Sequence, residues 1–342
     1  MIALNLAERG WLPDAVVRFG IRRLLKARLQ QQKALAQQNR SAIASFYERL
    51  RSEPIAVQTQ DANRQHYEMP AAMFRYILGH RMKYSCALFP TGTESLDQAE
   101  DAMLALTCTR ARLEDGMTIL ELGCGWGSLS LWMAEHYPNS RIVAVSNSAS
   151  QREFIEQEAA RRNLKQLRVI TSNVIDFDPH EQFDRIVSVE MFEHMRNYAL
   201  LLERVSQWLT STGKLFVHIF CHGEFGYLFE ESRGTDWMAK HFFSGGMMPS
   251  VDIFSYFQDH CIVTEQWTVN GNHYAATCDA WLANQDLKRK EIKCVLGNHL
   301  PKELVDLQYE RWRIFFMACA ELFRFNGGDE WLIGHFLLDK RA

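Results

Sequence analysis

From residue 117 onward, short apolar segments alternate along the chain with segments of helical pattern. Apolar runs of this length, bounded by turn residues, are typical of buried strands. The alternation predicts an α/β fold with a doubly wound, mostly parallel sheet, because each parallel strand needs a crossover to reach the next one. The expected strands span residues 118–122, 141–145, 167–171, 183–189 and 214–220, followed by a strand at 261–269 and a helix at 277–282.

Helical patterning dominates before this region and again at its end. Residues 1 to about 55 have apolar side chains at helical spacing, and the last segment reads as helical and aromatic as far as Trp331. Residues 223–257 interrupt the alternation with Gly, Trp, Phe and Met, which indicates an insertion or lid. We therefore expect an N-terminal helical region over 1–115 that covers the substrate and cofactor. The α/β domain over 116–342 then contains the insertion and C-terminal helices.

The N-terminal helical segment has two faces of different character. Its apolar face carries Val17, Ile21, Leu24, Leu25 and Leu29. Its basic face carries Arg18, Arg22, Arg23, Lys26 and Arg28. The sequence favours a solvated basic face with the apolar side docked on the body of the protein. The sequence does not decide whether this helix contacts a membrane surface. It also does not decide whether the protein forms a homodimer.

Composition narrows the class of protein. The 342 residues are 47% apolar and 12% aromatic, which is enough for one large α/β domain with appended helices, or for two domains. A net charge of -3 and a pI near 6.5 argue against a nucleic-acid binder, which normally has a basic face. No apolar run is long enough to span a bilayer. The first residues are too short and too charged a stretch for a signal peptide.

The eight cysteines are scattered and form no C-x-x-C pair. This spacing supports neither a zinc site nor a disulfide framework. We therefore expect buried thiols in a reducing, cytoplasmic compartment, and no metal. His222, beside Cys221, is expected to be structural.

The run Ile119–Gly127 is the most informative part of the chain. It joins an apolar strand to glycines at 123, 125 and 127, which can take positive φ and let bare backbone approach a ligand. The helix-like segment that begins at Ser128 adds unpaired N–H groups at the same place. This strand, turn and helix predict a nucleotide-like ligand.

The residues around the turn decide between a dinucleotide and S-adenosylmethionine. The dinucleotide fingerprint G-x-G-x-x-G requires glycine at position 128 and an acidic residue about 20 positions further on. The chain has Ser128, and its second strand ends in Asn147. Glu121, inside the first strand, instead resembles the acid of the E/D-x-G-x-G element of class I methyltransferases. The turn therefore predicts an S-adenosylmethionine site.

Candidate catalytic groups follow the fourth strand. If a helical turn begins there, Glu190, Glu193 and His194 share one face by their i, i+3 and i+4 spacing. The carboxyl end of this strand lies beside the glycine turn, so the cluster is expected to have coupled pKa values and to face the ligand. Two carboxylates and an imidazole suit a cationic amine, which must be held and deprotonated before it attacks a methyl sulfonium.

Aromatic side chains outside the strands support this interpretation. Their faces stabilise ammonium and sulfonium ions by roughly 0.5–2 kcal/mol each. The set comprises Tyr67, Phe192, Trp237, Phe242, Phe243, Trp312, Phe315, Phe316 and Trp331.

The chain resembles the coclaurine N-methyltransferase group within the cyclopropane-fatty-acyl-phospholipid synthase superfamily of class I methyltransferases. The resemblance runs in order from about residue 60 to 342. It rests on stretches such as HYEMP (66–70), KYSC (83–86), LELGCGWGSLSLW (120–132), FDRIVSVEMFEHMRNY (183–198), FFSGGMMPS (242–250), VNGNHYAAT (269–277), WRIFF (312–316) and GDEW (328–331).

The resemblance implies roles for individual residues. S-adenosylmethionine, released as S-adenosylhomocysteine, would contact Tyr84, Ser85, Gly123, Gly125, Trp126, Asn147, Gln151, Asn173 and Val174. Glu193 and His194 would form the catalytic pair, with Glu190 nearby. The substrate pocket would include Tyr67 and Glu68, and we add Phe242 and Trp331 from the aromatic cover.

The sequence therefore predicts an S-adenosylmethionine-dependent N-methyltransferase of a small, isoquinoline-like aromatic amine. The alternative is methyl transfer to a lipid double bond, as in cyclopropane synthases. Cys86, Glu190 and His218 stand where those enzymes hold a bicarbonate ion. The cyclases resemble W-x-Y-Y in the C-terminal helix, whereas this chain has Phe315 after Trp312, so one anion-holding hydroxyl is missing. A non-catalytic binding protein is a third, weaker interpretation.

Overall fold

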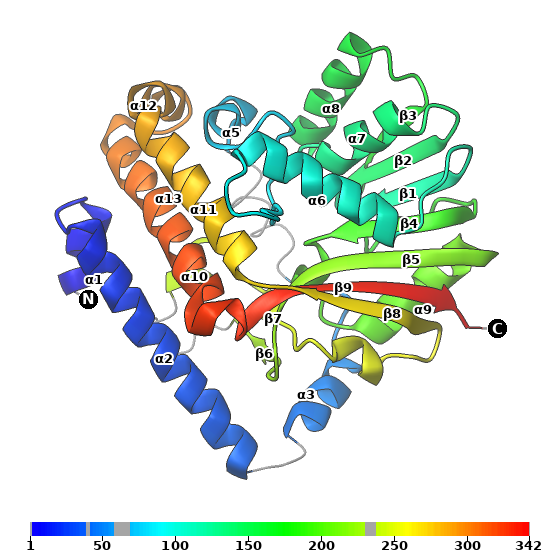
Figure 1. The fold of residues 1–342 in the computed structure, drawn as a ribbon, viewed down its shortest axis with the longest axis horizontal. Coiled ribbons are helices and arrows are strands. Elements are labelled where there is room, and N and C mark those ends of the chain that lie inside the picture. The colour runs from blue at the N-terminus through cyan, green and yellow to red at the C-terminus, as the bar shows by residue number, and fades with distance from the viewer. Residues whose placement is uncertain (1, 39–41, 58–68, 230–236, 342) are drawn as a thin grey trace.

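The computed structural model describes residues 2–38, 42–57, 69–229 and 237–341. A seven-stranded sheet in the order β3-β2-β1-β4-β5-β9-β8 organises the fold (Figure 1). Its strands are β1 (Thr118–Leu122), β2 (Arg141–Ser146), β3 (Leu167–Thr171), β4 (Phe183–Val189), β5 (Leu209–His222), β8 (Cys261–Val269) and β9 (Trp331–Lys340). β1 to β5 run parallel, and β9 is antiparallel to both of its neighbours. The doubly wound, mostly parallel sheet is confirmed.

The chain order reverses between β1 and β4. The chain runs outward from β1 to β2 and β3, and then returns to place β4 on the other side of β1. In open α/β sheets the crevice at such a switch point, outside the carboxyl ends of the strands, is where ligands bind. Here the glycine turn after β1 and the acidic segment after β4 border the same crevice.

Helices cover both faces of the sheet. On one face lie α6 (Leu96–Arg110), α7 (Ser128–His136) and α8 (Ala149–Arg161), above the sheet in Figure 1. On the other lie α3 (Ala42–Leu50), α9 (Tyr198–Trp208) and the 3₁₀ turn η3 (Ile253–Tyr256). Strand side chains alternate between the two layers: Ile119 packs toward α6 and α7, and Leu120 toward α9.

A block of helices lies beside the sheet, on the left in Figure 1. It consists of α1 (Ile2–Glu8), α2 (Asp14–Gln38), α5 (Ala71–Ile77), α11 (Asn272–Leu287), α12 (Arg289–Gly297) and α13 (Lys302–Phe323), followed by the 3₁₀ turn η4 (Phe325–Gly328). Ion pairs from Arg18 and Arg22, both 2.9 Å from the nearly buried carboxylate of Glu321, fasten α2 to α13.

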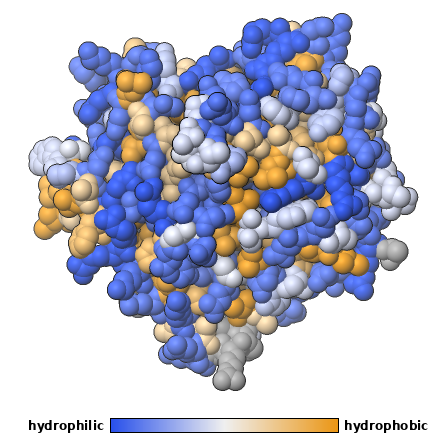
Figure 2. Space-filling view, in the orientation of Figure 1, coloured by the Kyte–Doolittle hydropathy of each residue, from blue (hydrophilic) through white to orange (hydrophobic). Residues whose placement is uncertain are grey.

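The apolar face of the N-terminal helix is docked as expected, apart from Leu24, but its basic face is not wholly solvated, because Arg18 and Arg22 pair with Glu321. On α2, Leu29 is buried and Val17, Ile21 and Leu25 pack against the core. Leu24 does not join them and is 72% exposed. It lies about 100° around the helix from Leu25. Figure 2 shows apolar side chains gathered at the left edge of the molecule, where Figure 1 places α1. Within the described residues, no helix has the length and apolar character needed to cross a bilayer.

The insertion stays outside the main sheet. The described part of 223–257 forms a separate two-stranded sheet of β6 (Tyr227–Leu228) and β7 (Met247–Met248), with α10 (Trp237–His241) and η3. His222, just before it, accepts the backbone N–H groups of Glu224 and Phe225 through Nδ1. This supports its expected structural role.

The expected helical C-terminus is wrong beyond Gly328. Residues 331–340 form β9, an interior strand between β5 and β8. Its residues Trp331 and Ile333 to Leu338 are buried on both faces of the sheet. A strand covered on both faces shows no alternation, and periodicity alone does not separate it from a buried helix.

Candidate active site

The glycine turn after β1 is a tight, left-handed backbone. Gly123, Gly125 and Gly127 all have positive φ, of 79°, 52° and 79°. The N–H groups of Gly123 and Cys124 both donate to the carbonyl of Val145 on β2, at 3.0 Å. A Cβ on Gly123 would lie 2.7 Å from the side chain of Met191, so only glycine fits between β1 and the segment after β4.

Two neighbouring cavities of unequal size border this turn. Both are lined by Gly123, Gly125, Gln151 and Glu190, so they form one divided site. We call the larger the outer cavity and the smaller the inner cavity. The outer cavity lies along the ends of β2 and β3 and the inner one against α6 and α7.

Every residue predicted to contact the cofactor lines this divided site. Asn147, Asn173 and Val174 line the outer cavity, and Tyr84, Ser85 and Trp126 the inner one. The two predicted glycines and Gln151 line both. The contacts of these residues to a cofactor remain a prediction, but the fold brings all of the predicted residues around one space.

Buried donors facing the site lack partners among the described residues. Gln151 is buried, and Ser146 donates to its Oε1 at 2.7 Å, which leaves Nε2 without an acceptor. Trp126 Nε1 and Ser128 Oγ, in the wall of the inner cavity, are also without a hydrogen bond. A buried polar group left unpaired costs about 1–3 kcal/mol. These donors fit a ligand that offers acceptors, such as the hydroxyl and carboxylate oxygens of S-adenosylmethionine.

Glu190 stands between the two cavities, directly after β4. Its φ of 50° is left-handed, which costs a non-glycine residue of order 1–3 kcal/mol. Its Oε1 accepts the backbone N–H of Cys86 at 2.9 Å, and its Oε2 accepts the hydroxyl of Tyr274 at 2.5 Å. Burial raises the pKa of Glu190, against the opposing effects of the Lys83 charge and of these hydrogen bonds.

The inner cavity also contains a buried cation that the sequence interpretation missed. Lys83 is 3% exposed and donates to Ser85 Oγ. Burial lowers the pKa of Lys83, and the charge of Glu190 opposes this. Tyr274 was missed as well. Both residues lie in stretches that carry the family resemblance, but which side chains of a stretch face a cavity depends on tertiary packing.

Glu121 is the third buried carboxyl of the site. It is the last but one residue of β1, lies on the wall of the inner cavity and accepts the hydroxyl of Ser130 on α7. Burial raises the pKa of Glu121 to about 8, although the Ser130 hydrogen bond and the Lys83 charge lower it.

The three candidate catalytic residues do not share one helical face. A short 3₁₀ turn, η1 (Phe192–His194), replaces the expected helix, because Glu190 is left-handed and Met191 packs against Gly123. Glu190 and His194 line the outer cavity. Glu193 is fully buried, and its Oε1 accepts the backbone N–H of Phe220 at 2.7 Å. Burial and the charge of Glu190 raise the pKa of Glu193.

The predicted substrate contacts differ in where they lie. Phe242 is buried and stacks on Phe315, with ring centroids 4.3 Å apart. Trp331 is also buried and donates from Nε1 to the hydroxyl of Tyr227 at 3.0 Å. Neither is among the described residues that line the two cavities. Tyr67 and Glu68 lie outside the described residues.

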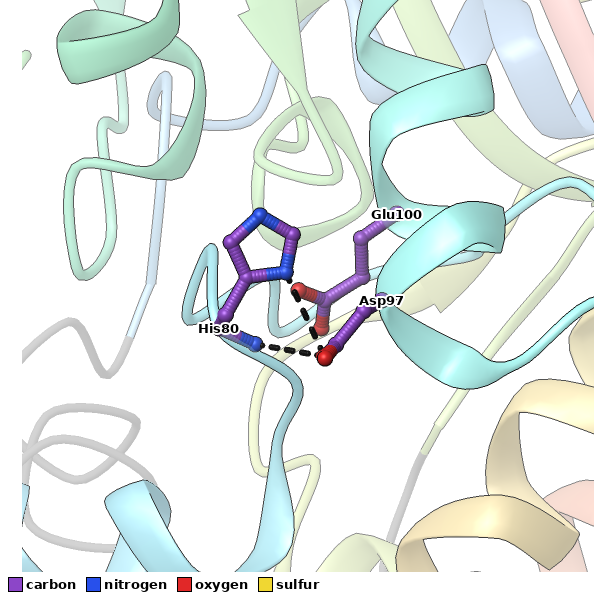
Figure 3. Close-up of side chains that lie close together, drawn as sticks. All are labelled: His80, Asp97 and Glu100. Carbon is purple, nitrogen blue, oxygen red and sulfur yellow. Dashed lines mark hydrogen bonds and ion pairs between the residues drawn. The ribbon is translucent and has the colours of Figure 1, made fainter.

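A second cluster of polar groups holds the loop that leads to Lys83. The backbone N–H groups of Gly79 and Arg81 donate to Glu100 at 2.9 Å. The backbone N–H of His80 donates to Asp97 at 2.8 Å (Figure 3). Within the described residues, the side chains of His80, Asp97 and Glu100 are close enough to hold a metal ion. Both oxygens of Glu100 already accept backbone donors, so the cluster holds residues 79–81 of the loop in place.

Comparison with known proteins identifies the group to which the chain belongs. The family model for mycolic acid cyclopropane synthetase matches residues 56–331. An (S)-coclaurine N-methyltransferase from Thalictrum flavum subsp. glaucum is 37% identical over 99% of this chain and 95% of its own length. The enzyme of the same name from Papaver somniferum is 34% identical over 99% of this chain and 97% of its own. The chain belongs to the mycolic acid cyclopropane synthetase family, within its coclaurine N-methyltransferase group.

A solved structure of this group supports the assignment. Coclaurine N-methyltransferase bound to N-methylheliamine and S-adenosylhomocysteine matches with a TM-score of 0.94, at 37% identity and over 99% of both chains. The family resemblance, the fold class and S-adenosylmethionine as cofactor are thereby confirmed, and this member of the family is an S-adenosylmethionine-dependent methyltransferase.

We expect a side chain at Gly125 to block cofactor binding without additional damage to the fold. Gly125→Val and Gly116→Val both place a side chain at positive φ, and the Cβ of each meets no atom within 4 Å. Each should lose about 1–3 kcal/mol of stability from backbone strain. Only Gly125 lines the cavities, so only Gly125→Val should lose affinity for S-adenosylhomocysteine in a calorimetric titration. Wild-type affinity in this variant would contradict the assigned site.

Glu121 should make the unfolding free energy of the ligand-free protein depend on pH. Its folded pKa of about 8 lies above the ordinary 4.5, so its stabilising contribution is complete below about 4.5 and is lost as the pH rises through 8. Glu121→Gln should flatten this decline in urea unfolding measured from pH 5 to 9. The exposed Glu153→Gln serves as the control and should keep the wild-type slope. An unchanged slope in Glu121→Gln would show that the carboxyl is ionised throughout.

Proposed function

We propose that this methyltransferase transfers a methyl group to the nitrogen of a small aromatic amine, of the isoquinoline type. The observation that carries the proposal is that Glu190 and His194 form part of the wall of the outer cavity, beside the predicted cofactor contacts. The relatives named as N-methyltransferases match nearly the whole chain, including the aromatic C-terminal helices.

The residues of the wall suit a cationic amine. Glu190 and Glu193 are buried carboxyls whose raised pKa values fall again when a cation enters, because an opposite charge stabilises the carboxylate. An amine must lose its proton before its nitrogen lone pair can attack. His194 lines the cavity, and its ring is stacked on Phe243 with centroids 4.6 Å apart, which fixes its orientation.

In this proposal His194, which lines the outer cavity, orients the amine and accepts its proton. Glu193, fully buried and in neither cavity lining, acts on this reaction through its charge. S-adenosylmethionine supplies the methyl group when bound, held by the glycine turn, Asn147 and Gln151. Tyr67 and Glu68 remain the proposed substrate contacts. Phe242 and Trp331, which are buried and line neither cavity, are proposed to shape the substrate pocket through packing. Exclusion of water speeds displacement at a sulfonium, because charge disperses as the methyl moves.

Methyl transfer to a lipid double bond is the competing function. Cys86, Glu190 and His218 are together, as that chemistry would need. Position 315, however, carries a phenyl ring stacked on Phe242, with no hydroxyl to offer. Tyr274 supplies a hydroxyl from α11 instead, and Glu190 already accepts it. This arrangement favours the amine.

We further propose a cytoplasmic location, supported by eight free cysteines. The exposed apolar residues on α1 and α2, among them Ile2 and Leu4, leave contact with a membrane surface or a second copy of the chain as open proposals.

A panel of amines with labelled S-adenosylmethionine tests the function. Benzylisoquinolines, tetrahydro-β-carbolines and biogenic amines should be compared with vesicles of unsaturated phospholipid. We expect label on an isoquinoline-type amine and none on the lipid. Label on the lipid alone would support the cyclopropane synthase function, and no transfer despite cofactor binding would support a binding protein.

Substitution of the catalytic pair should lower turnover with little effect on cofactor binding. Glu193→Gln and His194→Ala should each reduce kcat by about 10²–10⁴-fold, the usual range for a lost acid or base. His180→Ala, on the surface, is the control and should keep wild-type kcat. If both variants turn over normally while binding S-adenosylhomocysteine, the pair has no part in the reaction.

A further inference from the structure

A row of buried polar side chains connects Glu190 to α6. Arg110 Nη1 lies 2.8 Å from His335 Nδ1, and His335 Nε2 lies 2.9 Å from His218 Nδ1. His218 Nε2 in turn lies 3.2 Å from Glu190 Oε1. Both histidines are completely buried. None of the candidate roles discussed above uses Arg110 or His335.

Strand register places these groups side by side. His335 on β9 is the direct cross-strand partner of His218 on β5, and Glu190 follows Val189, the β4 partner of His218. On the far side of β9, His335 pairs with Trp267 of β8, and the Arg110 guanidinium lies 5.0 Å from the centre of that indole ring. The two histidines of the row are therefore held by strand pairing, and Arg110, in the last turn of α6, forms its outer end.

The hydrogen bonds along this row all run in one direction, with each donor on the Arg110 side and each acceptor on the Glu190 side. Arginine has five N–H donors and no acceptor, so His335 Nδ1 must present its lone pair to Arg110. Burial lowers the pKa of both histidines, so each is neutral and carries one N–H. The proton of His335 is then on Nε2 and points at His218 Nδ1. The proton of His218 is likewise on Nε2 and points at Glu190.

We propose that Arg110 and His335 are positioning residues that set the tautomer of His218, so that its Nε2–H holds Glu190 as an oriented, acceptor-only carboxylate beside the cofactor turn. Every group that touches this carboxylate then donates to it: the N–H of Cys86, the hydroxyl of Tyr274 and His218 Nε2. The neighbouring charges are Lys83, which favours the ionised form, and Glu193, which opposes it. The role in turnover rests on the proposed function, whereas the tautomers do not.

Histidine side-chain nitrogen NMR tests the tautomers directly in the ligand-free protein. Long-range ¹⁵N–¹H correlation spectra should show His218 and His335 as neutral Nε2–H rings. The signals are assigned with His218→Phe and His335→Phe. Arg110→Met should move the His335 proton to Nδ1, or divide it between both nitrogens, and Arg110→Lys should restore the wild-type spectrum because lysine is also only a donor. Nδ1–H rings in the wild type, or an unchanged spectrum in Arg110→Met, would overturn the proposal.

The pH dependence of methyl transfer tests the consequence for Glu190. If His218 donates less well, the Glu190 carboxylate becomes easier to protonate. The acid limb of the kcat/KM profile in Arg110→Met should therefore move up by about one pKa unit, so that kcat/KM at pH values below the limb falls about tenfold relative to wild type. Arg110→Lys should return the limb toward its wild-type position. Arg112→Met is the matched control, because Arg112 pairs with Glu265 at the surface and should leave the limb unmoved. A changed tautomer with an unmoved limb would also overturn the proposal. If no amine is methylated, the proposed function fails and the NMR result still decides the tautomers.

Discussion

The close approach of backbone at Gly123 is the constraint on which the site depends. Val145 accepts the turn's N–H groups on one side, and Met191 leaves no room for a side chain on the other. The ends of β1, β2 and β4 are thereby drawn into one crevice. A wider turn would separate the ligand-binding backbone from the acidic segment, and the two cavities would no longer share Glu190.

The same crevice concentrates carboxyl groups with little exposure to solvent. Glu121 and Glu193 are buried, Glu190 is nearly buried, and each has a raised pKa. Removing carboxylates from water is unfavourable unless donors or cations compensate. Here Ser130, Tyr274 and backbone N–H groups compensate in part. The part of the desolvation cost that stays uncompensated favours binding of a positively charged ligand. Such a ligand can be a protonated amine or a sulfonium.

Much of this arrangement could be predicted from the sequence because it is encoded locally. The parallel strands, the glycine turn and the residues after β2 and β3 depend on patterns a few residues long, and they lie where the sequence indicates. Glu193 and β9 could not be predicted in the same way. The direction of the Glu193 side chain depends on the left-handed backbone of Glu190 and on the hydrogen bond that Glu193 accepts from the Phe220 N–H. β9 is buried on both faces, so its sequence shows no alternation. Lys83, Tyr274 and His335 reach the site only through tertiary packing and strand register.

The place of β9 in the sheet has a consequence for how the chain acquires its structure during synthesis. β8 ends at Val269 and β9 begins at Trp331, yet β9 lies between β8 and β5. Until β9 emerges from the ribosome, β5 has an unpaired edge and β8 has no neighbour at all. Open edges of this kind invite pairing with other chains. The helices α11 to α13, which are made in the interval, are thus the first cover available to the growing sheet, and chaperone dependence should be greatest over that interval.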